Sequence, residues 1–296
     1  MIYMCGIAGW LNFGENISAN EKVFNAMSKT LERRGPDDGG MYISPNVVLM
    51  HRRLAVVDIE NGKQPMYKTH YGNEYIIVYN GEIYNTPELR RELSALGNRF
   101  SGHSDTEALL SAYIEWGEDC PVHLNGIFAF AIYDKRNKKL FCARDRAGVK
   151  PFFYHSCRRG FIFGSEIKTL LAHPDVSSVV DRNGIGEVFL IGPGRTPGST
   201  AFCDISELKP GECAVYDSDG LKIRSYWSLS ALEHTDTSEE TAEKIRFLVT
   251  DSIRRQLVSD VPLCCFLSGG LDSSIISSVA SGEYKSYGRC LSTYSV

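Results

Sequence analysis

The sequence lacks the features that would connect it with a membrane or a nucleic acid. Its 296 residues contain 32 Lys and Arg against 36 Asp and Glu, so the formal net charge is −4, and no run of like charges occurs. This balance argues against nucleic acid or an anionic membrane as a partner. No apolar stretch approaches the roughly 18 residues of a membrane-spanning helix, and the first residues lack the pattern of a secretory signal. We therefore expect a cytoplasmic protein.

The nine cysteines show no disulfide or metal pattern. Their number is odd, their spacing is irregular, and no Cys-x-x-Cys pair occurs, which gives no support for a zinc site or a dithiol redox motif. No cluster of His, Cys and carboxylate residues has metal-ligand spacing, so no resident metal is expected. In a reducing compartment most of these thiols would be buried small hydrophobic residues, and Cys264 and Cys265 are expected to be core residues.

The length suggests about two domains. Short runs rich in β-branched and aromatic residues predict strands at 7–11, 47–51, 75–79, 127–133, 140–144 and 161–164. The run at 127–133 is apolar almost throughout, as in a strand covered on both faces. Helices are predicted over 18–33, begun by a capping box of Ser18 and Glu21, from Pro87 to Gly97, and over 105–116. A mixed α+β domain is therefore expected over residues 5–190.

A different organisation follows. Gly- and Pro-rich turns mark residues 191–237 as edge strands and a linker. Residues 238–296 then predict an amphipathic helix, a strand, a Gly-rich loop, a second helix and a second strand. This βαβ order starts a parallel α/β sheet. Two parallel strands cannot bury both faces of a sheet, so we expect an incomplete domain with exposed apolar surface over 261–296.

The loop of this βαβ unit has the composition of a phosphate site. It reads Ser268-Gly269-Gly270-Leu271-Asp272-Ser273-Ser274. Its glycines let the backbone approach an anion, and the helix N-terminus favours negative charge. Asp272 suits a Mg²⁺ ion that accompanies a phosphate. The Gly-Lys-Ser/Thr element of a Walker loop is missing. The alternative is an ordinary strand-to-helix turn without a ligand.

The loop resembles the pyrophosphate loop of the ATP pyrophosphatase superfamily. That resemblance implies binding of ATP with Mg²⁺, and places Leu267 and Val296 near the adenine. The ATP-binding residues it implies are Leu267, Ser268, Gly269, Gly270, Asp272, Ser273 and Val296.

A second set of motifs begins with Cys5, which alone would pass for a core cysteine entering a strand. The set comprises Cys5-Gly6-Ile7-Ala8-Gly9, Arg34-Gly35-Pro36-Asp37, the segment 51–58 (HRRLAVVD), Asn80-Gly81-Glu82-Ile83-Tyr84-Asn85 and Ser104-Asp105-Thr106-Glu107. In this order the motifs resemble class II glutamine amidotransferases. Together with the downstream loop they resemble glutamine-hydrolysing asparagine synthetases, as do the segments 145–151 and 164–168.

The resemblance implies an N-terminal-nucleophile glutaminase domain, an αββα sandwich, followed by the start of an α/β ATP-pyrophosphatase domain. Cys5 would attack glutamine, with its own α-amine as the base, and the Asn80 side chain and the Gly81 N–H would form an oxyanion hole. Arg53 would pair with the substrate carboxylate, and Asp105 and the region of Glu82 would hold its ammonium group. The full implied glutamine-binding set is Arg53, Leu54, Val57, Asn80, Gly81, Glu82 and Asp105.

Each of these residues has an ordinary alternative when taken singly. Asn80-Gly81 could form a type I′ turn, Arg53 could be a surface charge, and Asp105 could be an N-cap.

One departure from the family also matters: Met1-Ile2-Tyr3-Met4 precede Cys5, and a cysteine behind an amide bond has no α-amine. We expect translation to start at Met4 and this methionine to be removed.

The implied reaction converts aspartate, glutamine and ATP into asparagine, glutamate, AMP and pyrophosphate through β-aspartyl-AMP. This chain alone is expected to be at most a glutaminase. Two alternatives stay open: a stand-alone glutaminase domain that serves another acceptor, and an inactive fragment that binds or regulates. A homodimer is common among relatives of the family.

Overall fold

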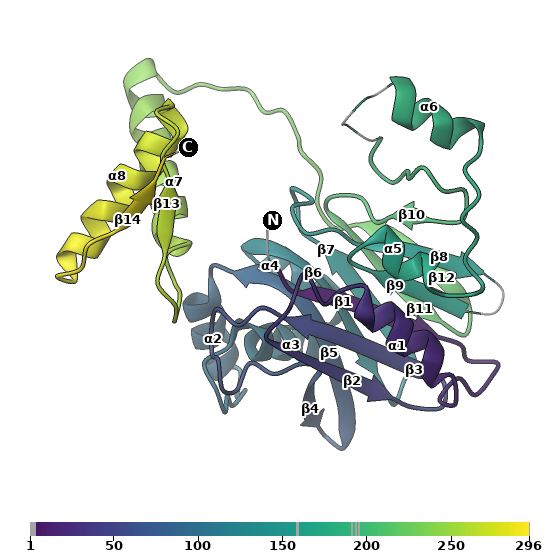
Figure 1. Ribbon diagram of the computed structural model, residues 1–296. Coiled ribbons are helices and arrows are strands. Elements are labelled where there is room, and N and C mark those ends of the chain that lie inside the picture. The colour runs from purple at the N-terminus through teal and green to yellow at the C-terminus, as the bar shows by residue number, and fades with distance from the viewer. Residues whose placement is uncertain (1–3, 158–159, 191, 193, 195, 296) are drawn as a thin grey trace. The chain divides into compact units, whose positions relative to one another are not determined.

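The computed structural model describes residues 4–157, 160–190, 192, 194 and 196–295 (Figure 1). The contacts between residues divide the chain into two units. The first unit comprises Met1–Ala55 and Glu60–Ser228, and the second comprises Val56–Ile59 and Leu229–Val296. The expectations for Met1-Ile2-Tyr3 and for Val296 lie outside the described residues.

The first unit contains two six-stranded sheets. The order in one is β10 (Ser206–Glu207), β8 (Phe153–Cys157), β9 (Gly160–Gly164), β1 (Gly6–Leu11), β3 (Val47–Arg53) and β2 (Asp38–Ile43). The order in the other is β12 (Gly220–Ser225), β11 (Glu212–Asp217), β7 (Lys139–Arg144), β6 (Gly126–Asp134), β5 (Asn73–Ile83) and β4 (Met66–His70). All neighbouring strands in both sheets are antiparallel.

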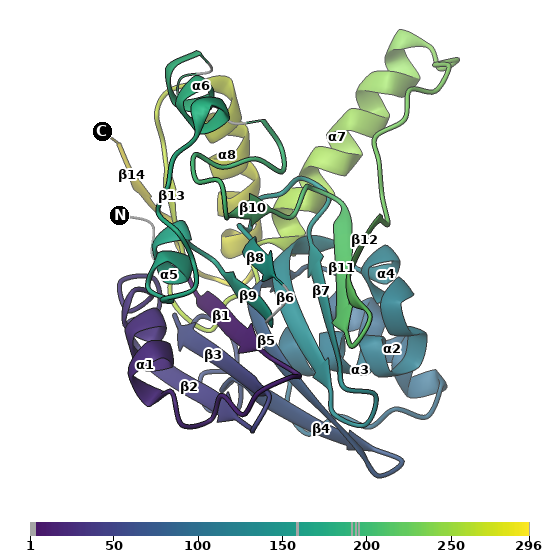
Figure 2. The same ribbon diagram turned by 90° about the vertical axis from the view of Figure 1, so that its right-hand side faces the viewer.

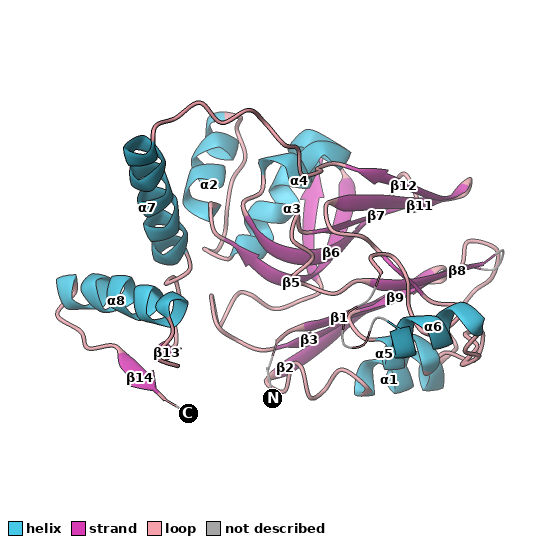
Figure 3. Ribbon diagram, turned by 90° about the horizontal axis from the view of Figure 1, so that it is seen from above, coloured by secondary structure: helices cyan, strands magenta, loops and turns pink. Residues whose placement is uncertain are grey.

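Helices cover the outer faces of both sheets, which Figures 2 and 3 show as four layers of the first unit. The helices α1 (Glu21–Lys29) and α5 (Ile167–Leu171) pack on the sheet that contains β1. The helices α2 (Thr86–Ala95), α3 (Asp105–Trp116) and α4 (Cys120–His123), with the 3₁₀ turn η1 (Gly117–Asp119), cover the sheet that contains β5. Helix α6 (Arg182–Leu190) follows α5 in the chain.

The alternation of apolar side chains between the two faces of each strand explains these four layers. On β5, Ile76 and Val78 enter the core between the two sheets, whereas Ile77 and Tyr79 pack toward α2 and α3. On β1, Ile7 lies between the sheets and Ala8 packs toward α1. Because successive side chains of a strand point to opposite faces, a strand that is apolar throughout needs cover on both sides. The predicted αββα sandwich is confirmed.

All six predicted strands are present; β5 is longer than predicted by six residues and the other five by one or two. Strand β6 is buried on both faces as expected. The strands β2, β4 and β12 lack the apolar signal of the others because they are edge strands, whose side chains are largely exposed or half-buried. The strands β11 and β12 fall inside the segment predicted as edge strands and linker.

The predicted start of the first helix is wrong. Helix α1 begins at Glu21 after Asn20, and the Ser18 hydroxyl donates to Asn16 Oδ1 at 2.7 Å instead of capping the helix. The Asn16 side chain binds the Ser18 hydroxyl, which is then not available to cap the helix, and residues 16–18 form a local turn.

The second unit holds the predicted βαβ arrangement. Helix α7 (Ser238–Arg255) precedes β13 (Cys264–Phe266), α8 (Leu271–Ser286) and β14 (Ser292–Tyr294), and β13 pairs with β14 in parallel. The core assignment of Cys264 and Cys265 is wrong, because Cys264 is exposed and Cys265 half-buried. A two-stranded sheet leaves strand faces open, and large apolar side chains including Phe266, Leu271 and Tyr294 are exposed, as expected.

No helix in the part of the chain that the structure describes is long and apolar enough to cross a membrane.

Candidate functional site

Cys5 lies immediately before β1 and contacts the backbone that follows β3. The Leu54 N–H donates to Cys5 Sγ at 3.4 Å, and the thiol donates to the Leu54 carbonyl at 3.5 Å. The Cys5 carbonyl accepts from Arg34 Nε at 3.0 Å. The antiparallel register, which sets Gly6 opposite Arg52, brings Leu54 beside the thiol. A predicted site residue therefore meets the predicted nucleophile through its main chain.

The thiol needs a base. Burial raises the pKa of Cys5, and the Leu54 N–H and the charges of Arg53 and Lys150 act in the opposite direction without cancelling it. The thiol is therefore protonated at neutral pH. Among residues 4–157 and the other described parts, no His, Asp or Glu side chain hydrogen-bonds to Cys5 Sγ. An amine on Cys5 itself would meet this need.

Asn80 and Gly81 lie inside β5, opposite Ala129 and Phe128 of β6, so the turn alternative is wrong. A Cβ atom on Gly81 would lie 2.2 Å from the Ile127 carbonyl oxygen, which explains the glycine. Asn80 is 1% exposed, and its Nδ2 has no hydrogen-bond partner among the described residues. A buried donor without a partner is unusual in a folded protein. An oxyanion would satisfy it.

Arg53 ends β3 and is 6% exposed, so the surface-charge alternative is wrong. A buried guanidinium is costly unless anionic or hydrogen-bonding groups surround it, and Arg53 is one of the charges that lower the pKa of Cys5. Val57 belongs to the segment Val56–Ile59, which groups with the second unit. It is therefore not among the residues that the first unit brings together.

Asp105 is the first residue of α3, and the N-cap is Ser104, whose hydroxyl accepts from the Glu107 N–H. The N-cap alternative for Asp105 is therefore wrong. Its Oδ2 accepts from the Tyr79 hydroxyl at 2.8 Å and from the Ile83 N–H at 3.1 Å. These contacts flank the Asn80–Glu82 segment and fix it to α3. Burial raises the pKa of Asp105, and the hydrogen bonds oppose the rise.

Glu82 is half-buried, and it lies near Lys150, a residue for which the sequence predicted no role. Burial raises the pKa of Glu82, and the positive charge of Lys150 acts against that rise. Lys150 lies in a turn that Asp145 organises, because Asp145 accepts from the backbone N–H groups of Phe128, Val149 and Lys150. Sequence reasoning missed Lys150, Asp145 and Arg34 as site residues. The signal available was their place in the motif segments 34–37 and 145–151.

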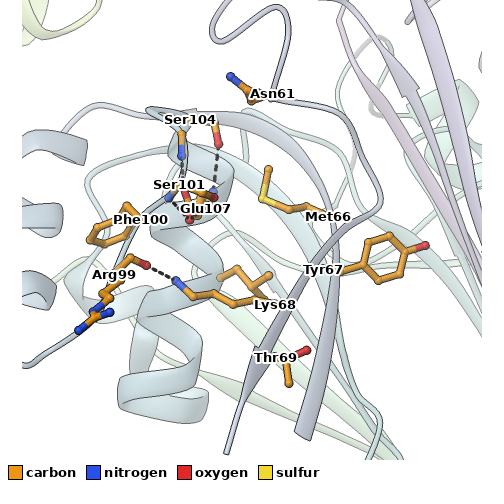
Figure 4. Close-up of a pocket in the computed structure, with 12 residues that line it drawn as sticks. Asn61, Met66, Tyr67, Lys68, Thr69, Arg99, Phe100, Ser101, Ser104 and Glu107 are labelled. Atoms are coloured by element: carbon orange, nitrogen blue, oxygen red, sulfur yellow. Dashed lines mark hydrogen bonds between the residues drawn. The ribbon is translucent and has the colours of Figure 1, made fainter. Parts of the chain in front are cut away.

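A pocket of about 430 Å³ lies elsewhere in the first unit, beside β4 and the start of α3 (Figure 4). Its buried Glu107 accepts from the Ser101 N–H and hydroxyl and from the Gly102 N–H. Lys68 donates to the Arg99 carbonyl and to Ser111. No predicted site residue lines this pocket.

The loop between β13 and α8 contains the glycines and hydroxyl groups of the predicted phosphate site. Gly269 adopts φ +81°, a conformation that favours glycine. The Ser268 and Ser273 hydroxyls lie 3.0 Å apart, and the Ser274 hydroxyl donates to the Gly270 carbonyl at 2.8 Å. Leu267 N–H donates to the Tyr294 carbonyl, which joins the loop to β14. The open first turn of α8 and the exposed Asp272 fit a phosphate with its metal ion.

Comparison with known proteins places two family segments along the chain. The family model for a glutamine amidotransferase domain matches residues 4–227, and the model for asparagine synthase matches residues 244–296. Asparagine synthetase [glutamine-hydrolyzing] 3 of Bacillus subtilis is 51% identical, over 99% of this chain and 48% of its own length. A putative asparagine synthetase [glutamine-hydrolyzing] 2 of Methanocaldococcus jannaschii is 36% identical, over 92% and 56%. The chain thus spans about half the length of the curated relatives it matches.

Solved structures support the fold. Glutamine phosphoribosylpyrophosphate amidotransferase of B. subtilis superposes with a TM-score of 0.53 at 16% identity, covering 98% of this chain and 65% of that one. A structure described as the allosteric regulatory enzyme of purine biosynthesis gives 0.54 at 15% identity, covering 98% and 64%. The match of residues 4–227 and the geometry around Cys5 lead to one conclusion: the chain belongs to the glutamine amidotransferase family and carries, at residues 244–296, a segment of the asparagine synthase type.

Proposed function

We propose that the Cys5 site hydrolyses glutamine to glutamate and ammonia. Cys5 Sγ attacks the side-chain amide carbon, and the α-amine of Cys5 takes the thiol proton and delivers it to the leaving nitrogen. Ammonia departs and a thioester remains. Water then attacks the thioester, glutamate leaves, and the thiol is restored.

One observation carries this proposal: the buried amide nitrogen of Asn80 has no partner among the described residues. With the Gly81 N–H it would stabilise the oxyanion of both tetrahedral intermediates. Arg53 would bind the glutamine carboxylate, and Glu82 and Asp105 would face its ammonium group. The hydrogen bonds of Asp105 to Tyr79 and Ile83 give it a second role, which is to hold the oxyanion donors in place.

The α-amine requires removal of the residues before Cys5. Among the described residues, the backbone nitrogen of Cys5 has no hydrogen-bond partner, so a new amine there would be available to the thiol. We propose that the active chain begins at Cys5. The intact mass of the purified protein would reveal this processing.

As part of a longer protein, the second unit would contribute to asparagine synthesis. ATP and Mg²⁺ would bind at Ser268, Gly269, Gly270, Asp272 and Ser273, and aspartate would be activated as β-aspartyl-AMP for attack by ammonia. The match of residues 244–296 to the asparagine synthase model supports this role. The lack of a disulfide pattern among the nine cysteines supports a cytoplasmic setting, and a homodimer belongs to the same proposal.

The test is glutamate release from glutamine by the processed chain. Cys5→Ala should abolish it, whereas Cys203→Ser, at an exposed thiol outside the site, should leave it unchanged. In a full-length form, Cys5→Ala should also abolish glutamine-dependent asparagine synthesis and spare the ammonia-dependent reaction. Equal loss of both reactions would contradict the division between the two sites.

A further inference from the structure

The buried ammonium group of Lys150 is weakly hydrogen-bonded, which is unusual for a residue that only stabilises the fold. The residue is 8% exposed, yet among the described residues its ammonium group hydrogen-bonds only to the thioether of Met4, with Nζ 3.1 Å from Sδ. A thioether is a weak acceptor, and a buried ammonium normally has oxygen partners. The charge is therefore held in the interior with little compensation from direct hydrogen bonds.

The backbone around Lys150 is firmly fixed. Its N–H donates to Asp145 Oδ2 at 2.9 Å, and its carbonyl accepts from Arg144 Nε at 2.8 Å. Arg144 also pairs with Glu207 at 3.0 Å. This rigid support places the ammonium at Met4, the residue whose removal would expose the Cys5 amine.

Charged groups act on both Lys150 and Cys5. Burial lowers the pKa of Lys150, whereas the nearby Glu82, Cys5 and Asp145 act against that shift and Arg34 adds to it. The thiol of Cys5 in turn is affected by Lys150 and by two further charges, Arg53 and Asp105. Two of the charges that act on the Cys5 thiol, Lys150 and Arg53, are cations, so Lys150 adds to a positive field at Cys5.

We propose, on the basis of the proposed glutaminase function, that Lys150 is a positioning residue whose buried positive charge keeps the Cys5 α-amine in its free-base form and favours the thiolate. A positive charge beside an amine disfavours protonation of that amine, because protonation would create a second positive charge next to the first. The same charge stabilises the thiolate. Removal of Met4 takes away the only hydrogen-bond partner of the Lys150 ammonium in the described structure, which leaves the charge free to act on the new amine.

The experiment is the pH dependence of kcat/KM for glutamine, measured on the processed chain with Lys150→Met and Lys150→Arg. The Met variant should move the acid limb to higher pH by about one unit and lower the rate at pH 7 about tenfold, whereas the Arg variant should stay close to the wild type. Lys139→Met is the matched control, because Lys139 is half-buried and pairs with Glu118 at 2.9 Å outside the site.

A loss of rate in Lys150→Met without movement of the acid limb would assign Lys150 a structural role and overturn the inference, as would an unchanged profile. If the processed wild-type chain releases no glutamate, the proposed function fails instead. Alkylation of Cys5 by iodoacetamide, followed by mass spectrometry across pH, then tests Lys150 separately. The Met variant should shift the alkylation midpoint to higher pH, and an unshifted midpoint would overturn the inference.

Discussion

Arg144 Nη1 and Glu207 Oε1 form a buried ion pair at 3.0 Å that joins the two sheets of the first unit. Arg144 ends β7 in one sheet, and Glu207 lies on β10 in the other. The remaining guanidinium N–H groups donate to the carbonyls of Lys150, Gly148 and Leu208 at 2.8, 2.8 and 2.6 Å. The pair therefore also supports the turn that carries Lys150.

Replacing Glu207 by Ala should destabilise the first unit, because it leaves a buried guanidinium without its carboxylate. We expect the free energy of unfolding in urea to fall by about 3 kcal/mol. The control is Glu74→Ala, which breaks the largely exposed pair of Lys135 and Glu74 at 2.7 Å and should cost about 1 kcal/mol or less. Similar losses in the two variants would contradict the role assigned to the buried pair.

Replacing Asn80 by Ala should lower kcat/KM for glutamine by about 10²- to 10³-fold, as expected for the loss of one oxyanion donor. Stability should change little, because Nδ2 makes no hydrogen bond in the described structure. Asn73, on the same strand, provides the contrast: its Nδ2 donates to Asp134 at 2.8 Å. Asn73→Ala should lower stability and leave kcat/KM of the folded protein near the wild-type value. An active Asn80→Ala variant would remove the oxyanion role.

Replacing Gly81 by Ala should disrupt the pairing of β5 with β6. The added Cβ would lie 2.2 Å from the Ile127 carbonyl oxygen and 2.8 Å from Phe128 Cα, so the strands have to move apart. We expect a loss of about 1–3 kcal/mol in unfolding free energy, together with reduced glutaminase activity. Gly282→Ala, in α8, where the new Cβ would meet no atom within 4 Å apart from its chain neighbours and the nearby helix backbone, should leave the unfolding of the first unit unchanged. Wild-type stability of Gly81→Ala would refute the close approach.

His51 should make the first unit sensitive to acid. Burial lowers its pKa from 6.5 to about 4, and its Nε2 lies 3.1 Å from the Tyr79 carbonyl oxygen. The unfolded chain therefore binds more protons than the folded one between these pH values. The contribution of the neutral His51 to the free energy of unfolding should be fully present above pH 6.5. It should be lost as the pH decreases toward 4, by about 3 kcal/mol over the whole window.

Urea unfolding at pH 7.5, 6 and 5 would measure this effect. His51→Gln should flatten the dependence without removing it, because burial also lowers the pKa of His173 to about 4. An unchanged slope in the His51 variant would assign the acid sensitivity to other groups.

Most elements of the fold were predictable because their signal is local. The strands β1, β3, β5, β6, β7 and β9 are apolar on one or both faces, and α3 begins and ends at clear signals. The edge strands β2 and β4 were not predicted, since each has a solvent-facing side and so a weak apolar pattern. The misplaced start of α1 reflects competition between two local hydrogen bonds, which composition does not decide.

The resemblance of the motifs to class II glutamine amidotransferases pointed to Cys5, Arg53, Asn80, Gly81 and Asp105. Their alternatives were decided only by position: Arg53 is buried, Asn80 lies within a strand, and Ser104 holds the cap position beside Asp105. Those facts depend on contacts between residues far apart in the chain, such as the bond of Tyr79 to Asp105.

The sequence by itself determined the order of elements, the two motif sets and the chemical character of each site. Only the tertiary structure decided which charges surround Cys5. Lys150 lies 146 positions from Met4 in the chain, yet its ammonium contacts that residue at 3.1 Å. The physical reason is that periodicity and propensity act over a few residues, whereas burial of a charge depends on the packing of two sheets and their connecting turns.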